Sequence, residues 1–124
     1  MEELVARNEL MYMAVCNTFY TKEDEDHCEV YRKDNNLSVG KRHRVTGKNK
    51  KAKVYITVNV PWPDGSKKME KKARVIYMLN HGPIPEDRQI MHWDGDKENF
   101  ELDNLVCANQ QQANALVMRQ EGIA

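Results

Sequence analysis

An abrupt stop in the C-terminal half of the chain is the strongest constraint on the fold. Good helix formers with apolar residues at helical spacing predict a helix over roughly 71–80. Gly82 stands where a helix often ends in a left-handed residue, and Pro83 and Pro85 cannot continue a helix. The chain must therefore change direction here, and the residues that follow form separate elements.

Two short strands and one more helix are predicted after that stop. Residues 89–93 and part of 102–108 lean apolar, and the polar segment 94–101 separates them as a loop. Asn109 is a suitable N-cap for a last helix, and Gln112 can close a capping box with it. The predicted C-terminal order is helix, strand, loop, strand, helix.

The N-terminal part mixes both kinds of element. Helix formers predict a helix over 2–16, and clean alternation of apolar and polar residues predicts a half-buried strand over 53–60. We predict a polar turn at 21–26, a short strand at 28–32 and a charged loop or arm over 34–53. The expected fold class is α+β, with an N-terminal helix and a short antiparallel sheet.

Length and composition agree with one small domain. The chain has 124 residues, of which 40% are hydrophobic and 31% charged, values typical of a soluble globular protein. We divide it into residues 1–70 and 71–124, expected to form one compact unit. An acidic start and the lack of a long apolar run favour a cytoplasmic protein without a signal peptide. Three cysteines without a Cys-x-x-Cys pair predict free thiols and no zinc site.

Charge is unevenly distributed although the formal net charge is zero. Residues 37–74 hold 12 bases and 2 acids, a local charge of +10. Such a basic stretch is typical of a phosphate-binding surface, and the plain alternative is a solvated lysine-rich loop. The side chains expected to contact nucleic acid are Lys41, Arg42, Arg44, Lys48, Lys50, Lys51, Lys53 and Arg74. Lys67, Lys68, Lys71 and Lys72 would extend the same surface.

One ordered motif points to a specific chemistry. Its matching residues are His92, Asp94, Gly95, Asn99, Asp103, Asn104 and Leu105. In type and register the motif resembles the HNH endonuclease family, in the branch of phage and intron homing endonucleases. The preceding helix and the turn from His81 to Pro85 also resemble that family, so the resemblance covers the last 55 or so residues well.

The resemblance implies a ββα-metal motif that hydrolyses phosphodiesters. His92 would be the general base, since a histidine titrates near neutral pH. Asn104 would hold the loop so that His92 is correctly aimed. A divalent cation, Mg²⁺ or Mn²⁺, would neutralise charge on the phosphate, with Asn114 as its expected ligand and Asp94 as a weaker one. The implied partner is double-stranded DNA, read with little sequence specificity or with specificity supplied by the arm and residues 53–68.

The sequence also departs from the family pattern. Met91 stands where the family often has a metal-binding aspartate, and Ala113 where it has a helical His or Asn. Glu101 and Ala73 replace an expected arginine and histidine. These departures favour an alternative function, a non-catalytic binding protein on an HNH scaffold. Such a protein would be a phage-type inhibitor or regulator that acts on DNA or on a protein partner.

Overall fold

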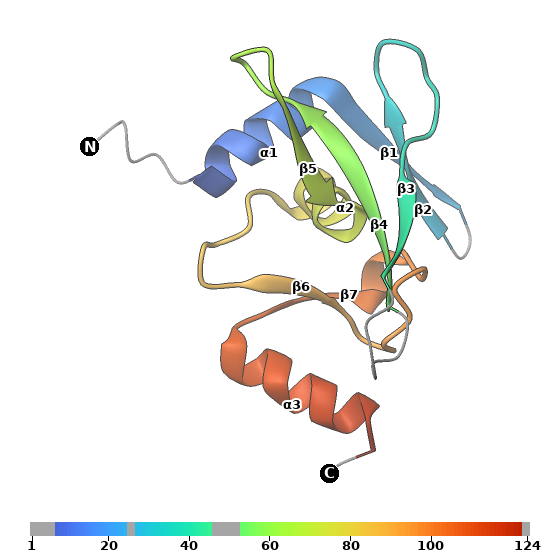
Figure 1. The fold of residues 1–124 in the computed structure, drawn as a ribbon, viewed down its shortest axis with the longest axis vertical. Helices are drawn as coiled ribbons and strands as arrows, with labels where there is room; N and C mark the ends of the chain where they lie inside the picture. The colour runs from blue at the N-terminus through green and yellow to red at the C-terminus, as the bar shows by residue number, and fades with distance from the viewer. Residues whose placement is uncertain (1–6, 25–26, 46–52, 123–124) are drawn as a thin grey trace.

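The computed structural model describes residues 7–24, 27–45 and 53–122. In chain order the elements are α1 (Arg7–Thr18), β1 (Phe19–Asp24), β2 (His27–Arg32), β3 (Lys41–Val45), β4 (Lys53–Pro61), β5 (Lys67–Lys71), α2 (Lys72–His81), β6 (Gln89–His92), the 3₁₀ turn η2 (Leu102–Asn104), β7 (Leu105–Ala108) and α3 (Gln110–Gln120). The strands pair as β1–β2, β3–β4–β5 and β6–β7, all antiparallel. The α+β class expected from the sequence is confirmed (Figure 1).

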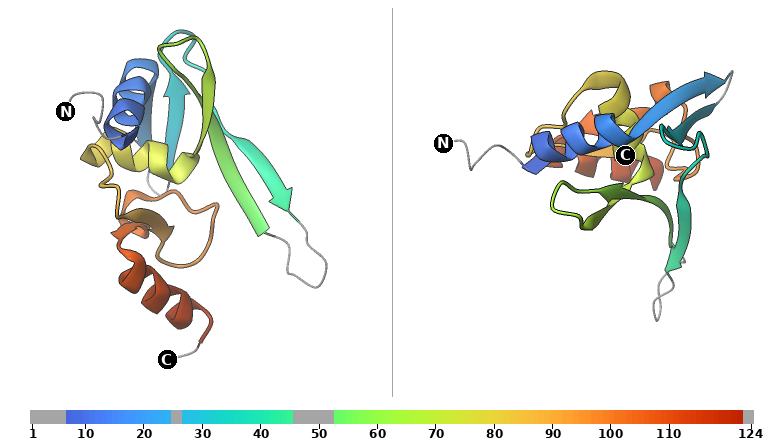
Figure 2. Two further views of the ribbon diagram at one scale, coloured as in Figure 1. Left: turned by 60° about the vertical axis from the view of Figure 1, so that its left-hand side comes forward. Right: turned by 90° about the horizontal axis from the view of Figure 1, so that it is seen from above.

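The layers are a sheet, two helices and a hairpin with its own helix. In Figure 2, α1 and α2 lie on one side of the β3–β4–β5 sheet, and its other side carries no helix of the described chain. The β6–β7 hairpin lies between α2 and α3 (Figure 1) and contacts both helices. The C-terminal order of helix, strand, loop, strand and helix is therefore confirmed.

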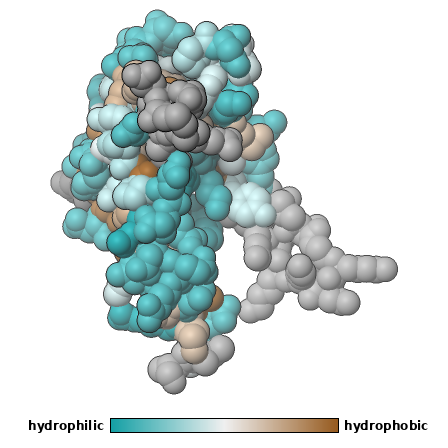
Figure 3. Space-filling model, turned by 90° about the vertical axis from the view of Figure 1, so that its left-hand side faces the viewer, coloured by the Kyte–Doolittle hydropathy of each residue, from teal (hydrophilic) through white to brown (hydrophobic). Residues whose placement is uncertain are grey.

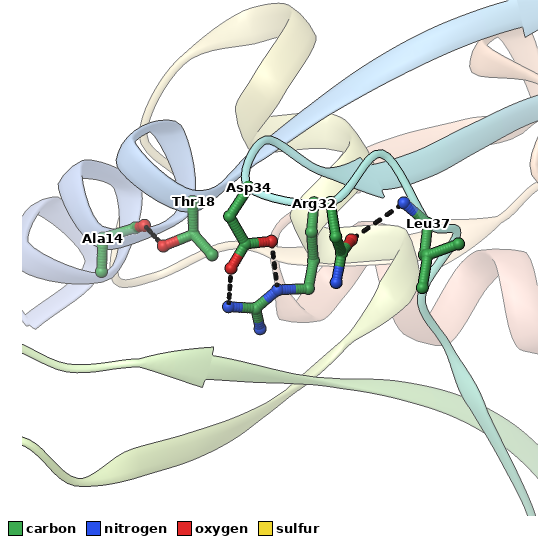
Figure 4. Close-up of polar contacts among 6 residues, drawn as sticks. Ala14, Thr18, Arg32, Asp34 and Leu37 are labelled. Atoms are coloured by element: carbon green, nitrogen blue, oxygen red, sulfur yellow. Dashed lines mark hydrogen bonds and ion pairs between the residues drawn. The ribbon is translucent and has the colours of Figure 1, made fainter.

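The first hairpin corrects the prediction of a polar turn at 21–26. Residues up to Asp24 belong to β1 and pair with β2 along its whole length. Phe19 at the start of β1 is buried, and so are Cys28 and Val30 in β2. These buried positions fix the pairing, so the charged residues of β1 extend the ladder although their own pattern indicates a turn. The opening helix α1 ends at Thr18, whose Oγ1 donates to the Ala14 carbonyl at 2.9 Å (Figure 4).

The charged segment 34–53 is only partly a loop, because residues 41–45 form β3. Their backbone pairs with β4 from Lys41↔Thr57 to Val45↔Lys53. A strand of basic residues has no apolar alternation to reveal it, and the ladder with β4 supplies its backbone hydrogen bonds. The strand predicted at 53–60 is confirmed as β4, and the tight turn after it leads into β5, which the sequence analysis missed.

The core lies between the sheet, α1, α2 and the two hairpins. Its fully buried side chains include Phe19, Val60, Ile76, Met78 and Ile84. Val58 and Val60 face inward from β4, as the predicted alternation requires. Met13 and Met118 lie outside this core and are exposed, at 57% and 48%.

The outer surface is mainly hydrophilic. On the face shown in Figure 3, apolar patches are small and scattered among polar side chains. Among the described residues, the helices are all too short or too polar to cross a bilayer.

The turns around the last hairpin follow the sequence signals closely. Gly82 ends α2 with φ 101°, a value that a side chain would make costly, and its N–H donates to the Met78 carbonyl. Asn109 accepts from the Gln112 N–H, and the Gln112 side chain accepts from the Asn109 N–H, so the predicted capping box is confirmed. These caps set the entry and exit of the unit that carries His92.

Candidate active site

His92 is the last residue of β6, and its ring is buried. Only 7% of the residue is exposed, and the ring lies edge-on to Phe100 with centroids 5.6 Å apart. Nδ1 lies 3.0 Å from the carbonyl oxygen of Asn99. A carbonyl only accepts, so Nδ1 carries the proton and Nε2 carries the free lone pair. The fold thus holds the imidazole in the tautomer that a general base requires.

The electrostatics of His92 favour its neutral form. Burial is the main cause that lowers the pKa of His92, and the hydrogen bond to the Asn99 carbonyl opposes it. The positive charge of Lys97 lowers this pKa further. A neutral imidazole at pH 7 can accept a proton, which is the state that base catalysis needs.

Asn104 closes the loop that follows His92. It is buried, and its Oδ1 accepts from the backbone N–H of Asp94 at 3.0 Å. Its Nδ2 donates to Asp94 Oδ1 at 3.0 Å and to the Asn99 carbonyl at 3.1 Å. The Asn99 carbonyl therefore accepts hydrogen bonds from both His92 Nδ1 and Asn104 Nδ2. This arrangement agrees with the positioning role that the resemblance implies for Asn104.

Asp94 is largely committed to the same loop. Its Oδ1 accepts from the Asp96 N–H at 2.8 Å as well as from Asn104, and its Oδ2 accepts from Asn99 Nδ2 at 2.8 Å. These hydrogen bonds, the one from Asn99 first, lower the pKa of Asp94. A carboxylate has about four acceptor positions, so three are in use here. Asp94 is thus mainly a structural anion of the loop.

The two faces of the β6–β7 hairpin differ in chemistry. Ile90 packs against the main core, and side chains alternate along β6, so His92 shares that core face while Met91 points to the side of α3. The buried residues of α3 are Ala113 and Leu116. The two positions where the family usually has metal ligands, Met91 and Ala113, are therefore both apolar and both belong to the hairpin–α3 side.

The residues present do not fit a resident divalent cation. Within the described ranges, no three His, Cys, Asp or Glu side chains gather closely enough to hold a metal ion. Asn114, the ligand expected on α3, is exposed, and its Oδ1 accepts from Gln110 Nε2 at 2.9 Å one turn earlier. The thioether of Met91 is a poor partner for Mg²⁺, which prefers hard oxygen ligands. No described contact joins Asn114 to His92.

The basic residues expected at the nucleic-acid surface fall into three groups. Lys41 and Arg42 are exposed on β3, and Arg42 Nε pairs with Glu98 of the His92 loop at 3.0 Å. This ion pair links the β3–β4 hairpin to the candidate active site. Arg44 and Lys53 lie in β3 and β4, where only their backbone is described. The predicted contacts Lys48, Lys50 and Lys51 lie outside the described residues.

Two other basic residues lie in ion pairs. Arg74 is half-buried, with its Nε paired to Glu70 at 3.2 Å, so it is not a free cation for phosphate. Lys72 is buried, and its Nζ forms an ion pair with Glu29 Oε1 at 2.5 Å. Its Nζ also lies 4.6 Å from the centre of the Phe100 ring, which the His92 ring contacts edge-on. Both residues lie in the first turn of α2, whose buried residues include Lys72.

Residues that the sequence analysis missed complete the surroundings of His92. Phe100 is buried at 2% exposure, and a lone aromatic residue in a polar loop is the signal that would have found it. Gln120 at the end of α3 donates to the carbonyls of His92 at 2.6 Å and Trp93 at 3.0 Å. No sequence pattern reveals that contact, since it joins residues 28 apart. Trp93 is 47% exposed, and the Arg119 guanidinium lies 4.4 Å from the centre of its ring.

The fold and the site together define a class: a ββα unit in which the first strand ends in a neutral, oriented histidine. The family model described as HNH endonuclease matches residues 70–115, from the end of β5 into α3. Residues 70–115 therefore match the HNH endonuclease family, as the motif predicted. Comparisons with curated proteins and with solved structures gave no match.

Proposed function

We propose that this protein is a nuclease that cuts or nicks the phosphodiester backbone of double-stranded DNA, with His92 as general base. The observation that carries the proposal is the hydrogen bond from His92 Nδ1 to the Asn99 carbonyl, within a domain of the HNH endonuclease family. That bond leaves Nε2 free to accept a proton. Burial keeps the ring neutral at pH 7 by lowering the pKa of His92.

The proposed reaction uses the residues in simple roles. His92 Nε2 removes a proton from water, the water oxygen attacks phosphorus, and the bond to the leaving oxygen breaks. The Asn99 carbonyl stabilises the positive charge that develops on the ring, as an acceptor on Nδ1 does in other catalytic histidines. Asn104 keeps that carbonyl in place and is a positioning residue. The leaving oxygen takes its proton from solvent.

Metal dependence is a separate part of the proposal. The described side chains form no cage for a cation, so Mg²⁺ or Mn²⁺ would have to be held by substrate phosphates and water, with at most Asp94 or Asn114 assisting. Mg²⁺ is commonly bound in this shared way, through phosphates and one or two protein oxygens.

The choice of DNA rests on charge. The segment 37–74 carries a local charge of +10, and non-specific affinity for a duplex comes mainly from neutralised phosphates. Arg42, through Glu98, joins this segment to the loop that follows His92. A duplex held by the β3–β4 hairpin would therefore lie next to the candidate base.

One observation favours the second function, a non-catalytic binding protein on the same scaffold. Met91 and Ala113 place apolar side chains at both positions where the family usually has metal ligands. A protein that only binds DNA or a protein partner, as a phage-type inhibitor or regulator would, has no need of those ligands.

A nicking assay separates the two functions. Supercoiled plasmid is incubated with the full-length protein and Mg²⁺ or Mn²⁺, with EDTA added in parallel. We expect nicking by wild type that His92→Ala abolishes and that the control His81→Ala, at the exposed end of α2, retains. Activity in EDTA would remove the metal from the proposal. Tight duplex binding without nicking under any condition would establish the binding protein instead.

A further inference from the structure

The described residues place no helix over the outer face of the β3–β4–β5 sheet (Figure 2). Directly opposite residues of antiparallel strands share a face, so the register places Lys41, Thr57 and Lys71 in one row and Asn59 with Met69 in the next. Val58 and Val60, which alternate with these residues on β4, point into the core. The opposite side of the sheet is covered by α1 and α2 (Figure 2).

A hollow runs across this face, with a cavity volume of about 340 Å³. Central strand β4 forms its floor with Thr57 and Asn59, while Lys41 of β3 and Lys67 of β5 line it from the two flanking strands. His43 lies beside the floor, with its Nε2 2.7 Å from Thr57 Oγ1. The floor therefore offers neutral hydrogen-bonding groups, and the flanking strands offer cations.

The charge of the face has one sign. Lys41, Lys67 and Lys71 are exposed, and the strand residues of this face whose side chains are described include no acid. Glu70, the acid of β5, points inward and pairs with Arg74. Arg32, at one end of the hollow, is neutralised by a two-point pair with Asp34 at 3.0 Å (Figure 4). A polyanion is the complementary partner.

We infer that this outer face reads duplex DNA by lying in the major groove, with lysines on phosphates and the β4 floor on base edges. Neighbouring strands lie about 5 Å apart, and the major groove of B-DNA is about 12 Å wide and admits a two-stranded ribbon. Lysines bind phosphates without reading sequence, while Asn and Thr side chains match base edges and apolar groups contact the thymine methyl. Asn59 supplies the side chain for base edges, and Met69 supplies the apolar group for the thymine methyl.

This inference rests on the proposed function for its substrate class but adds a specificity surface on the sheet, where Lys41 of the 34–53 segment lies beside residues of β4 and β5. It also predicts a choice between duplexes. The major groove of A-form RNA is deep and too narrow for a strand pair, so double-stranded RNA should not bind through this face.

The test uses the full-length protein in EDTA, where binding is measured without dependence on cleavage. A preferred duplex is first selected from a random pool, and binding to it and to a scrambled duplex is followed by fluorescence anisotropy over a range of salt. Lys41→Gln/Lys67→Gln should reduce the slope of log K against log salt by about 2, since each phosphate contact contributes about 0.9. The control Lys22→Gln, an exposed lysine on β1, should leave the slope unchanged.

Asn59→Ala tests base reading separately from charge. It should reduce the preference for the selected duplex by about tenfold, within the range for one lost base contact, and leave the salt slope as in wild type. Failure to select any preferred sequence, an unchanged preference in Asn59→Ala, or equal binding of duplex RNA would overturn the inference. A wild type that binds in this way but never nicks plasmid would overturn the nuclease and leave this surface standing.

Discussion

The two faces of the β6–β7 hairpin differ in the residues that they carry. The core face keeps a complete polar arrangement, in which His92, Asn99 and Asn104 are joined by hydrogen bonds of 3.0–3.1 Å. The α3 face has Met91 and the buried Ala113 where ligands of a cation would stand. Because adjacent residues of a strand point to opposite faces, the side chains of one face can change without altering the hydrogen bonds of the other. The residues that orient His92 and the positions at which the family usually has metal ligands therefore lie on different faces of the hairpin.

Replacement of His92 should have the largest effect on any cleavage. His92→Ala should lower the nicking rate by about 10²–10⁴-fold, the usual contribution of a general base. Met91→Ala, a change of similar kind on the opposite face, should alter the rate only a few-fold. Single-turnover nicking rates of the two variants, with thermal unfolding as a check on folding, test the comparison. Equal losses in both variants would show that the two faces act as one site.

Asn104→Ala should cost the most stability on the core face. The change leaves the Asp94 N–H without its acceptor and the Asn99 carbonyl without one donor. Each such group costs about 1–3 kcal/mol when it is left unpaired and removed from water. Urea denaturation should show this loss, and Asn104→Asp should cost at least as much, because it places a second carboxylate oxygen beside Asp94 Oδ1 and the Asn99 carbonyl. Wild-type stability in Asn104→Ala would mean that the loop closes without this side chain.

Met91→Asp tests whether the α3 face can bind a metal ion. Alone, it places a carboxylate beside apolar neighbours of α3 and should cost about 1–2 kcal/mol without metal uptake. Met91→Asp/Ala113→Asn supplies two oxygen donors on one side of the hairpin, and a bound cation then stabilises the folded state by mass action. We expect the melting temperature of the double variant alone to rise with added Mg²⁺ or Mn²⁺. A rise in wild type of the same size would show that the native chain binds metal elsewhere.

The smallest expected effect is on pH dependence. Burial lowers the pKa of His92 below its ordinary value of about 6.5, so the unfolded chain takes up this proton first as pH falls. The stability conferred by a neutral His92 is therefore complete above about pH 6.5 and is lost as pH falls towards the lower, folded-state pKa. NMR titration of the His92 ring should give a midpoint below 6.5. A midpoint above 6.5 would contradict the proposed tautomer and its buried setting.

Much of the C-terminal unit could be predicted from the sequence because its signals are local. Gly82 and the prolines stop α2, Asn109 with Gln112 caps α3, and the ordered motif from His92 to Leu105 indicates the family. Such features act within a few residues of each other, so the chain order alone reveals them. The same is true of β4, whose alternation is visible without any partner.

The remaining features depended on tertiary structure. Strand β3 forms because its backbone pairs with β4, although its side chains are mostly basic. Strand β1 continues to Asp24 because it pairs with β2 along its length. The burial of Lys72 is made tolerable by Glu29, 43 positions earlier in the chain. The pairing of β6 with β7 places His92 and Met91 on opposite faces of the hairpin. Gln120 contacts the His92 carbonyl only because α3 packs against this hairpin. The sequence by itself determined which residues form the motif, because a motif is defined by residue type and spacing. Tertiary structure alone decided which of them face one another, because pairing and burial join residues whose separation along the chain carries no signal.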